Sequence, residues 1–364
     1  MSLKYPLSKT PAFVGVLFCA LGLVLSSCKD GSNSATKPAP EESTPDLALP
    51  SGNLEESAEK PAENAGQTAT DPRGADPVEP VINPNKPTSP YKGAKLMFYN
   101  VRNYLNMDRR VDGKYVKDAP KPEAEIEALV RLIVANKPDI LGLCEIGTKQ
   151  DLKDLQTRLK TAGLDLNYGE WVQASDPYRH LALLSRFPIT KRLSQTKLDY
   201  PIDGDRLPMS RGILDVIIDV NDQPLEVLVA HLKSKREVKN HDQAEMRRNE
   251  AKLLRQRMTE LLEADADARF VVLGDFNDTS KTAPIETLRG KYNTPTFCDT
   301  LELKASNGTY WTQFWSWQHV YSRFDYIFLS PALNPMIDAE NSFIVDHPDW
   351  SVASDHRALI MTFN

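Results

Sequence analysis

An apolar run, Val271-Val272-Leu273, leads directly into the polar tetrad Gly274-Asp275-Phe276-Asn277. The run indicates a buried strand, so the tetrad lies where that strand ends and a turn begins. Binding and catalytic groups are often displayed at such strand ends. On an extended backbone, residues two apart point to the same side. The tetrad therefore predicts either a short polar turn or an acid and an amide that act together on a substrate.

Strand-like and helix-like segments alternate through the C-terminal part of the chain. The link Asn221-Asp222-Gln223-Pro224 joins two apolar runs and predicts a hairpin, so we expect mixed rather than purely parallel sheets. The predicted class is therefore α/β. Expected strands cover 95–99, 139–144, 181–185, 212–220, 225–231, 269–274, 324–329 and 357–363, and expected helices cover 122–136 and 241–262.

The N-terminus has the pattern of an export signal. Lys4 and Lys9 precede an apolar run over 11–25 that is short for a membrane span but typical of a signal-peptide core. The run ends at Leu25-Ser26-Ser27-Cys28, which resembles the cleavage box of bacterial lipoproteins and implies a signal over 1–28 with lipidation of Cys28. An ordinary secretory signal is the alternative. Either way we expect an exported protein, and lipidation implies a lipid-anchored one, periplasmic or at the cell surface.

Residues 29–93 have the composition of a tether rather than of a folded domain. They hold 11 of the 26 prolines, together with many Ser, Ala, Glu and Asn residues. Such a segment cannot bury enough apolar surface to offset its ordering entropy, so we expect it to be disordered. Residues 94–364 are then expected to form one large domain.

Charge and cysteine content limit what this domain can be. Of the net charge of −6, the signal carries +2 and the tether −5, which leaves −3 for 94–364. This balance excludes a globally basic nucleic-acid binder. Cys144 and Cys298 are too few for a disulfide scaffold. We expect Cys144 to be a buried thiol, although a bridge between the two remains open.

Other polar residues also sit at the ends of apolar runs. Asp325 lies inside the run Arg323-Phe324-Asp325-Tyr326-Ile327, where a carboxylate is costly to bury unless it is paired. A histidine is a natural partner, because the carboxylate fixes its tautomer and stabilises its charged form. Together with Asp325, the residues expected to form one site are Asn100, Glu145, His231, Asp275, Asn277, Asp355 and His356.

The order of these segments resembles the endonuclease/exonuclease/phosphatase superfamily, also called DNase I-like. The matching stretches, which cover essentially all of 94–364, are Phe98-Tyr99-Asn100-Val101, Leu143-Cys144-Glu145, Ala230-His231-Leu232-Lys233-Ser234, Leu273-Gly274-Asp275-Phe276-Asn277, Phe324-Asp325-Tyr326-Ile327 and Ser354-Asp355-His356. The resemblance implies a four-layered α/β sandwich of two mixed β-sheets flanked by helices. It also implies a metal-dependent hydrolase of phosphate esters.

The same resemblance implies a metal site. Glu145 would be the principal ligand of a Mg²⁺ or Mn²⁺ ion, with Asn100 beside it and Asp355 near that ion or a second, weaker one. Oxygen ligands of this kind suit a hard divalent cation. Arg102 is a departure, because many members carry an acid two residues after the asparagine.

Roles in catalysis and phosphate binding are implied for the remaining residues. Asp275 would deprotonate the attacking water, and His356, paired with Asp325, would stabilise the charged transition state or protonate the leaving oxygen. The residues implied to contact phosphate are Asn100, Arg211, His231 and Asn277. For Arg211 a surface salt bridge is the alternative.

Two further patterns are ambiguous. Lys233, Lys235 and Arg236 either form a cationic rim for a polyanion or are simply solvated. The aromatic residues of the segment 311–317 either stack on bases or meet lipid, or they pack against their own domain. They are Trp311, Phe314, Trp315 and Trp317.

The expected function is that of an exported, tethered phosphoesterase. A nuclease acting on extracellular DNA or RNA is the first expectation. A phospholipase C or sphingomyelinase-like enzyme, or a phosphatase of sugar or inositol phosphates, is the second. A binding domain without catalysis is the third, but it has no need of Asp275, His356 and Glu145 together. We expect a monomer that needs no protein partner and meets the membrane only through its anchor.

Overall fold

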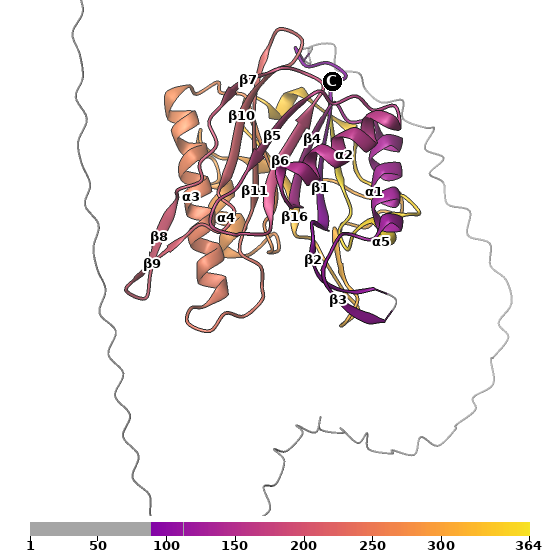
Figure 1. The fold of residues 1–364 in the computed structure, drawn as a ribbon. Helices are drawn as coiled ribbons and strands as arrows, with labels where there is room; N and C mark the ends of the chain where they lie inside the picture. The colour runs from indigo at the N-terminus through magenta and orange to yellow at the C-terminus, as the bar shows by residue number, and fades with distance from the viewer. Residues whose placement is uncertain (1–88, 112) are drawn as a thin grey trace, which may run out of the picture. The chain divides into compact units, whose positions relative to one another are not determined.

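The computed structural model of the chain describes residues 89–111 and 113–364 (Figure 1). The expected signal, the lipidation site Cys28 and the tether up to residue 88 lie outside the described residues, so they stay predictions. Among the described residues, no helix is both long and apolar enough to cross a bilayer.

The first sheet has six strands in the order β17-β18-β1-β4-β6-β5. Its central pair, β1 and β4, is parallel, whereas β4 and β6 are antiparallel. Three helices pack on its outer face through a shared apolar cluster. The elements are β1 (Lys95–Tyr104), β4 (Ile140–Ile146), β5 (Tyr168–Val172), β6 (His180–Ser185), β17 (Ile337–Ile344), β18 (Leu359–Phe363), α1 (Glu123–Asn136), α2 (Lys149–Thr161) and α5 (Trp350–Ala353).

The second sheet also has six strands, in the order β13-β16-β12-β11-β10-β7. Its central pair, β11 and β12, is parallel, and β16 pairs with β12 antiparallel. Two helices cover its outer face. The elements are β7 (Ile189–Arg192), β10 (Ile213–Asp219), β11 (Pro224–His231), β12 (Phe270–Asp275), β13 (Asp299–Thr300), β16 (Asp325–Leu329), α3 (Gln243–Ala264) and α4 (Ala283–Arg289).

The two sheets pack face to face over a common apolar core. Alternate residues of each strand point into it; in β1 these are Leu96 and Phe98. Gly142 of β4 allows the sheets to approach closely, because a Cβ there would lie 2.9 Å from Leu273 Cδ1 and 3.3 Å from Val229 Cγ2 on the opposite sheet. With helices outside both sheets (Figure 1), the expected four-layered α/β sandwich of two mixed sheets is confirmed.

Short elements complete the domain. Three two-stranded hairpins project from the sandwich, and a 3₁₀ turn precedes β17. They are β2 (Met107–Val111) with β3 (Lys114–Ala119), β8 (Asp199–Ile202) with β9 (Asp205–Pro208), β14 (Gln313–Trp315) with β15 (Val320–Ser322), and η1 (Asn334–Met336).

The expected long elements are present, and the link at 221–224 is the predicted hairpin, since β10 and β11 pair antiparallel. The expected ranges do not include α2, α4, α5, β5, β7, β13, β17 and the three projecting hairpins. Most of these elements are short, so they show little apolar periodicity, but α2 buries Leu152, Leu155 and Leu159 at helical spacing.

The folded domain begins earlier than residue 94, and this corrects the expected boundary of the tether. Tyr91 is fully buried, its ring lies 5.0 Å from that of Phe363, and its hydroxyl donates to Pro224 O at 2.5 Å. By composition residues 89–93 resemble the tether, since they include Pro90. Packing of the single aromatic side chain of Tyr91 nevertheless makes these residues part of the folded domain.

Replacing Tyr91 tests this boundary. We expect Tyr91→Ala to lower the free energy of unfolding by about 3 kcal/mol, because a large buried side chain is lost. Tyr91→Phe should lower it by about 1 kcal/mol, since only one hydrogen bond is removed. Urea denaturation followed by circular dichroism measures both, with Tyr292→Ala as control because Tyr292 is 72% exposed. An unchanged stability of Tyr91→Ala would place residues 89–93 outside the domain.

Candidate active site

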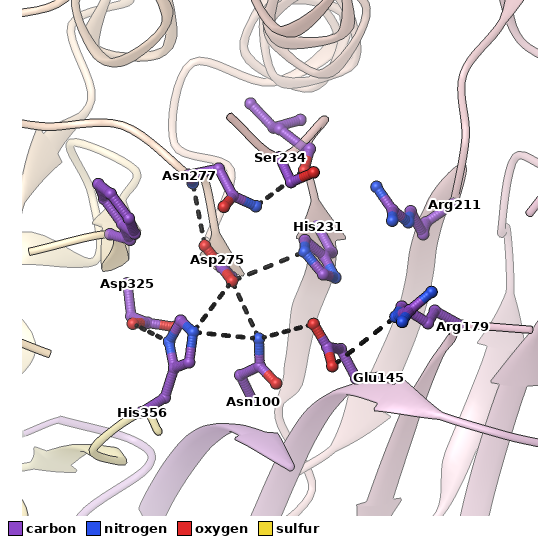
Figure 2. A network of polar contacts seen from close by, with 12 residues as sticks. Asn100, Glu145, Arg179, Arg211, His231, Ser234, Asp275, Asn277, Asp325 and His356 are labelled. Atoms are coloured by element: carbon purple, nitrogen blue, oxygen red, sulfur yellow. Dashed lines mark hydrogen bonds and ion pairs between the residues drawn. The ribbon is translucent and has the colours of Figure 1, made fainter. Parts of the chain in front are cut away.

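The polar residues expected at strand ends meet at one edge of the sandwich, between the two sheets (Figure 2). The parallel pairing of β1 with β4 brings Asn100 next to Cys144 in register, and hence close to Glu145. In the second sheet, the parallel register of β11 with β12 places His231 beside Asp275, and the antiparallel register of β16 places Asp325 on the other side of Asp275. The topology therefore assembles the cluster.

Asn100 connects the two halves of the cluster. Its Nδ2 donates to Asp275 Oδ2 at 3.0 Å and lies 3.4 Å from Glu145 Oε1. Its Oδ1 accepts the N–H of Arg102, and its backbone carbonyl accepts the Ser354 hydroxyl at 2.8 Å. These bonds hold the amide in one orientation, with its NH₂ group toward the carboxylates.

His356 forms the expected pair with Asp325. Its Nδ1 lies 2.8 Å from Asp325 Oδ2, and both side chains are buried. Its Nε2 faces Asp275 Oδ2 at 3.7 Å. Burial alone would lower the pKa of His356, but the Asp325 and Asp275 carboxylates outweigh it and hold this pKa well above its ordinary value. His356 is therefore an imidazolium at neutral pH, with Nδ1–H donated to Asp325.

Asp275 is poised to exchange a proton near neutrality. Burial, with a further contribution from the Asp325 carboxylate, raises its pKa to about 7, although His356 acts in the opposite direction. Its Oδ1 accepts the N–H of Asn277 at 2.9 Å, which orients the carboxyl group. A carboxylate with such a pKa suits a general base at physiological pH.

His231 has the opposite electrostatic environment. Burial, reinforced by Arg211, His356 and Arg179, lowers its pKa well below the ordinary value. The ring is therefore neutral, with Nε2 3.6 Å from Asp275 Oδ2 and without a hydrogen-bond partner for Nδ1 among the described residues. A neutral imidazole at this position can offer a substrate oxygen a hydrogen bond but no charge.

Asn277 occupies a left-handed backbone conformation with φ of 52°, which asparagine tolerates better than most residues. Its Nδ2 donates to Leu232 O at 3.0 Å. Asn277 therefore closes the turn of the tetrad and joins it to the end of β11. The tetrad therefore forms the predicted turn, with Asp275 facing the site; joint action of Asp275 and Asn277 on a substrate stays a prediction, since the Asn277 NH₂ group is engaged by Leu232 O.

Glu145 lies at an irregularity of β4, where the register with β6 shifts between Cys144 and Ile146. Its φ of 64° is uncommon for glutamate, and such strained positions cluster at functional sites. Bulges re-aim side chains in this way. The carboxylate accepts the N–H of Asn103 at 3.0 Å and keeps 16% of its side chain exposed.

The Glu145 carboxylate fits a divalent cation, whereas Asn100 turns its NH₂ group and not its oxygen toward Glu145, so its expected role as a ligand stays a prediction. Glu145 offers carboxylate oxygens that no arginine binds tightly, because Arg179 Nε is 3.9 Å away. Oxygen ligands with open access for water are what Mg²⁺ and Mn²⁺ prefer. Among the described residues, the group of acids and histidines with atoms within 4.8 Å of one another is instead Asp275, Asp325 and His356. Because the His356 Nδ1–H donates to Asp325, this second group is better suited to hold a proton than a metal ion.

Asp355, the third expected ligand, is 36% exposed, and its Oδ1 lies 3.9 Å from Arg102 Nε. The arginine that departs from the expected motif therefore faces this acid. Asp355 is adjacent to the Asn100 strand but does not belong to the group of three described above. Its role as a ligand stays a prediction.

The sequence analysis missed Arg179, which precedes β6 and lies beside Glu145 (Figure 2). Arg211 is 9% exposed, and its Nε lies 3.1 Å from Asp176 Oδ2. Arg211 therefore forms an ion pair, as the salt-bridge alternative predicted. The pair is buried at the site and does not lie on the surface. Gly212 shapes this loop, since its φ is 68° and a Cβ would lie 2.5 Å from Gln195 O.

Of the three basic residues after His231, Lys233 is buried, whereas Lys235 and Arg236 are exposed, so the choice between a cationic rim and a solvated surface concerns the last two. Lys233 is 9% exposed, and its Nζ donates to Ser234 O and Arg236 O within its own loop. Lys235 pairs with Asp278 at 3.0 Å. These lysines stabilise the loop and leave Arg236 as an exposed cation of the run.

The aromatic residues of the segment 311–317 fall into two groups, one packed against the domain and one exposed. Trp311 packs on Tyr321 and Trp350, and Phe314 stacks on Tyr321 at 4.4 Å between ring centres. Trp315 and Trp317 on the β14–β15 hairpin remain 48% and 83% exposed. The hairpin touches the site segment, since the N–H of Phe314 donates to Asp355 O. Packing thus explains only the first two aromatic residues.

Comparisons with known proteins agree with this geometry. Similar solved structures include the catalytic domain of human nocturnin with a bound sulfate anion, at 18% identity over 75% of this chain and 94% of that chain, with a TM-score of 0.53. TDP2 from Caenorhabditis elegans matches at 17% identity over 74% and 96%, with a TM-score of 0.51. A Bacteroides vulgatus endonuclease/exonuclease/phosphatase matches at 15% identity over 75% and 100%, with a TM-score of 0.52. At these identities the likeness establishes the fold.

Sequence comparison supplies the family. No curated protein matches the chain at a significant level. The sequence model of the Endonuclease/Exonuclease/phosphatase family, however, matches residues 97–356, which is well over half of the chain and includes every site residue described above. Members of this family are hydrolases of phosphate esters and generally depend on Mg²⁺. This chain belongs to the Endonuclease/Exonuclease/phosphatase family.

Proposed function

We propose that this protein uses a divalent cation held at Glu145 to hydrolyse phosphate esters by direct attack of water on phosphorus. The observation that carries the proposal is the group of Asp275, Asp325 and His356. It places a proton acceptor with a pKa of about 7 next to a histidine that stays charged. A binding domain has no use for two such buried groups, whose desolvation is costly.

Each protein group has a distinct task. Asp275 takes the proton of the attacking water, and the Asn277 N–H fixes the orientation of its carboxyl group. His356, held by Asp325, supplies a fixed positive charge to a phosphoryl oxygen. His231 is neutral and donates or accepts a hydrogen bond at a second oxygen. A cation bound at Glu145 would neutralise charge on the phosphate oxygens.

The geometry also supports one of the two expected roles of His356 over the other. In an in-line displacement, the attacking and leaving oxygens lie on opposite sides of phosphorus. His356 Nε2 lies only 3.7 Å from Asp275 Oδ2, on the side of the attacking water. His356 is therefore assigned to charge stabilisation of the phosphoryl group. Protonation of the leaving oxygen would require a group on the opposite side, toward Glu145.

Two finer expectations from the sequence are kept as parts of the proposal. A nucleic acid is one substrate class to be assayed, together with lipid and sugar phosphates. Export and anchoring through Cys28 would place this chemistry in the cell envelope. Support for these two points comes only from sequence patterns.

The roles of Glu145 and His356 can be tested by substitution. In the purified protein with Mg²⁺ or Mn²⁺, we expect Glu145→Gln and His356→Ala each to lower kcat on the order of a hundredfold or more. A chelator should abolish turnover reversibly. Substrates are plasmid DNA, RNA, sphingomyelin, phosphoinositides and simple phosphate monoesters and diesters. His347→Ala is the matched control, since His347 belongs to the same C-terminal segment but not to the site.

Turnover that resists the chelator and both substitutions would contradict the mechanism. Absence of turnover on every substrate would favour a binding domain instead.

The pH dependence of turnover follows from the pKa of Asp275. Only the ionised carboxylate accepts a proton, so its raised pKa should move the acid limb of kcat/KM from the ordinary value of 3.8 to about 7. The rate should therefore rise as pH increases through neutrality. The alkaline limb should lie well above 6.5, because His356 holds its proton there. A profile between pH 4 and 10 at fixed metal concentration measures both, and an acid limb near pH 4 would remove Asp275 as the base.

A further inference from the structure

The backbone of the site continues beyond the point where the sheet holds it. The ladder between β11 and β12 ends at the pair His231 and Asp275, and the N–H of Leu232 donates once more to Asp275 O at 3.0 Å. Asn277 lies past that point, yet its N–H orients the Asp275 carboxylate at 2.9 Å (Figure 2). The position of these groups therefore depends on contacts other than strand pairing.

The helix α3 bonds the chain that follows β11 through two buried charged side chains. Glu250 Oε2 accepts the N–H of Lys233 at 2.6 Å, and its Oε1 accepts the N–H of Ser210 at 3.0 Å. Arg247 lies three residues earlier on the same face of the helix, and its Nη1 donates to Lys233 O at 3.1 Å. Arg247 is 2% exposed and Glu250 is fully buried. The backbone N–H and C=O of Lys233 are thus both held by α3.

Arg247 also contacts the turn that follows β12. Its Nε donates to Asp278 Oδ2 at 2.8 Å, and Asp278 directly follows Asn277. Asn277 Nδ2 in turn donates to Leu232 O at 3.0 Å. One guanidinium group therefore joins the end of the His231 strand to the turn that orients Asp275, and the bonds form a closed ring around the two chain segments.

Covering the sheet does not require charged residues at these two positions. Ala251 and Leu254 of the same helix pack on the sheet with apolar side chains, whereas burying a charge is costly. What a carboxylate and a guanidinium add is direction. Two N–H donors need two acceptor oxygens at a fixed spacing, and a planar fork reaches two acceptors at once. Supporting groups of this kind hold a site in its productive geometry.

We propose that Arg247 and Glu250 are positioning residues for the hydrolytic reaction. They hold His231 and the turn at Asn277 in place relative to Asp275, and so keep the base oriented toward the attacking water. Both act through the backbone and not on the substrate. The inference rests on the proposed function, because it assigns the two residues to the same reaction.

Two conservative substitutions test the proposal. Glu250→Gln leaves one acceptor oxygen and turns an NH₂ group toward the second N–H, and Arg247→Lys keeps the charge without the fork. Each should lower kcat about tenfold or more and change KM less than about threefold, because the reacting groups are misplaced and not removed. The assay uses p-nitrophenyl phosphate and bis(p-nitrophenyl) phosphate with Mg²⁺.

Arg257→Lys is the matched control. Arg257 lies on the same helix, is 16% exposed and also reaches two acceptors, Asp215 Oδ2 and Glu226 Oε1, each at 2.7 Å. Glu226 belongs to β11 as His231 does, but lies near the start of that strand. This variant therefore loses a fork of the same kind away from the site. We expect urea denaturation to show reduced stability for Arg257→Lys and Arg247→Lys, with kcat unchanged in Arg257→Lys.

A second measurement does not depend on turnover. In nuclear magnetic resonance spectra of the full chain without substrate, the Lys233 amide proton should lie far downfield, because its bond to Glu250 is short and charge-assisted. It should move upfield in Glu250→Gln. The His231 ring signals and the Asn277 amide signal should shift in both site variants but not in Arg257→Lys. If circular dichroism shows that one variant is unfolded, Asp278→Asn replaces it, since it removes an acceptor from the same ring of bonds.

Three results would overturn the proposal. They are an unchanged kcat in both variants, a kcat that falls equally in Arg257→Lys, and a kcat that falls while the His231 and Asn277 signals stay as in the wild type. Failure of the proposed function is distinct, since the wild type would then turn over neither compound. The resonance shifts would in that case decide alone whether α3 positions these residues.

Discussion

A buried hydrogen bond from Asn100 Nδ2 to Asp275 Oδ2 connects the two sheets where their chemistry meets. Each partner ends or interrupts a central strand of its own sheet, so the bond fixes the distance between the two halves of the site. The carboxylate it reaches is also the one that His231 and His356 approach. A shift of either sheet would therefore change the spacing of every group in the cluster. The close contact at Gly142, deeper between the sheets, resists such a shift.

Two residues with uncommon backbone conformations lie at the edge of the sandwich that holds the site. Glu145 and Asn277 both have positive φ values, and both turn a side chain that a regular strand would have pointed elsewhere. Such positions persist only when the surrounding structure determines them. Here the determinants are backbone hydrogen bonds, from Asn103 to the Glu145 carboxylate and from Asn277 to Asp275. Backbone hydrogen bonds, from within the site and from next to it, thus hold both side chains in place.

The fold class and the central residues of the site were predictable from sequence. Long apolar runs encode β1, β4, β11 and β12, and polar residues that directly follow such runs must lie at the sheet edge. The cost of burying Asp325 predicted a histidine partner, and the family resemblance identified that partner as His356. Arg179 was not predictable, because it precedes β6 and reaches the site only through the antiparallel pairing of β6 with β4. No pattern in the neighbouring sequence predicts the pairing of β6 with β4.

The other misses have different causes. Helix α2 carried a readable signal, the capping box of Thr148 and Asp151, which was overlooked in a polar stretch. The place of Tyr91 depends on Phe363 and Pro224, which are distant in sequence. For the lysines after His231, the sequence shows the charges but not the acceptors that the lysines contact. It therefore could not distinguish a binding surface from a loop held by internal bonds.

The two cysteines of the described domain remain free and buried, in different apolar clusters. Burial, with nearby carboxylates, holds the pKa of the Cys144 thiol well above its ordinary value, although this residue directly precedes Glu145. A protonated, inaccessible thiol reacts poorly with oxidants and does not exchange disulfides. The folded domain is therefore indifferent to redox potential. It needs no thiol chemistry to mature.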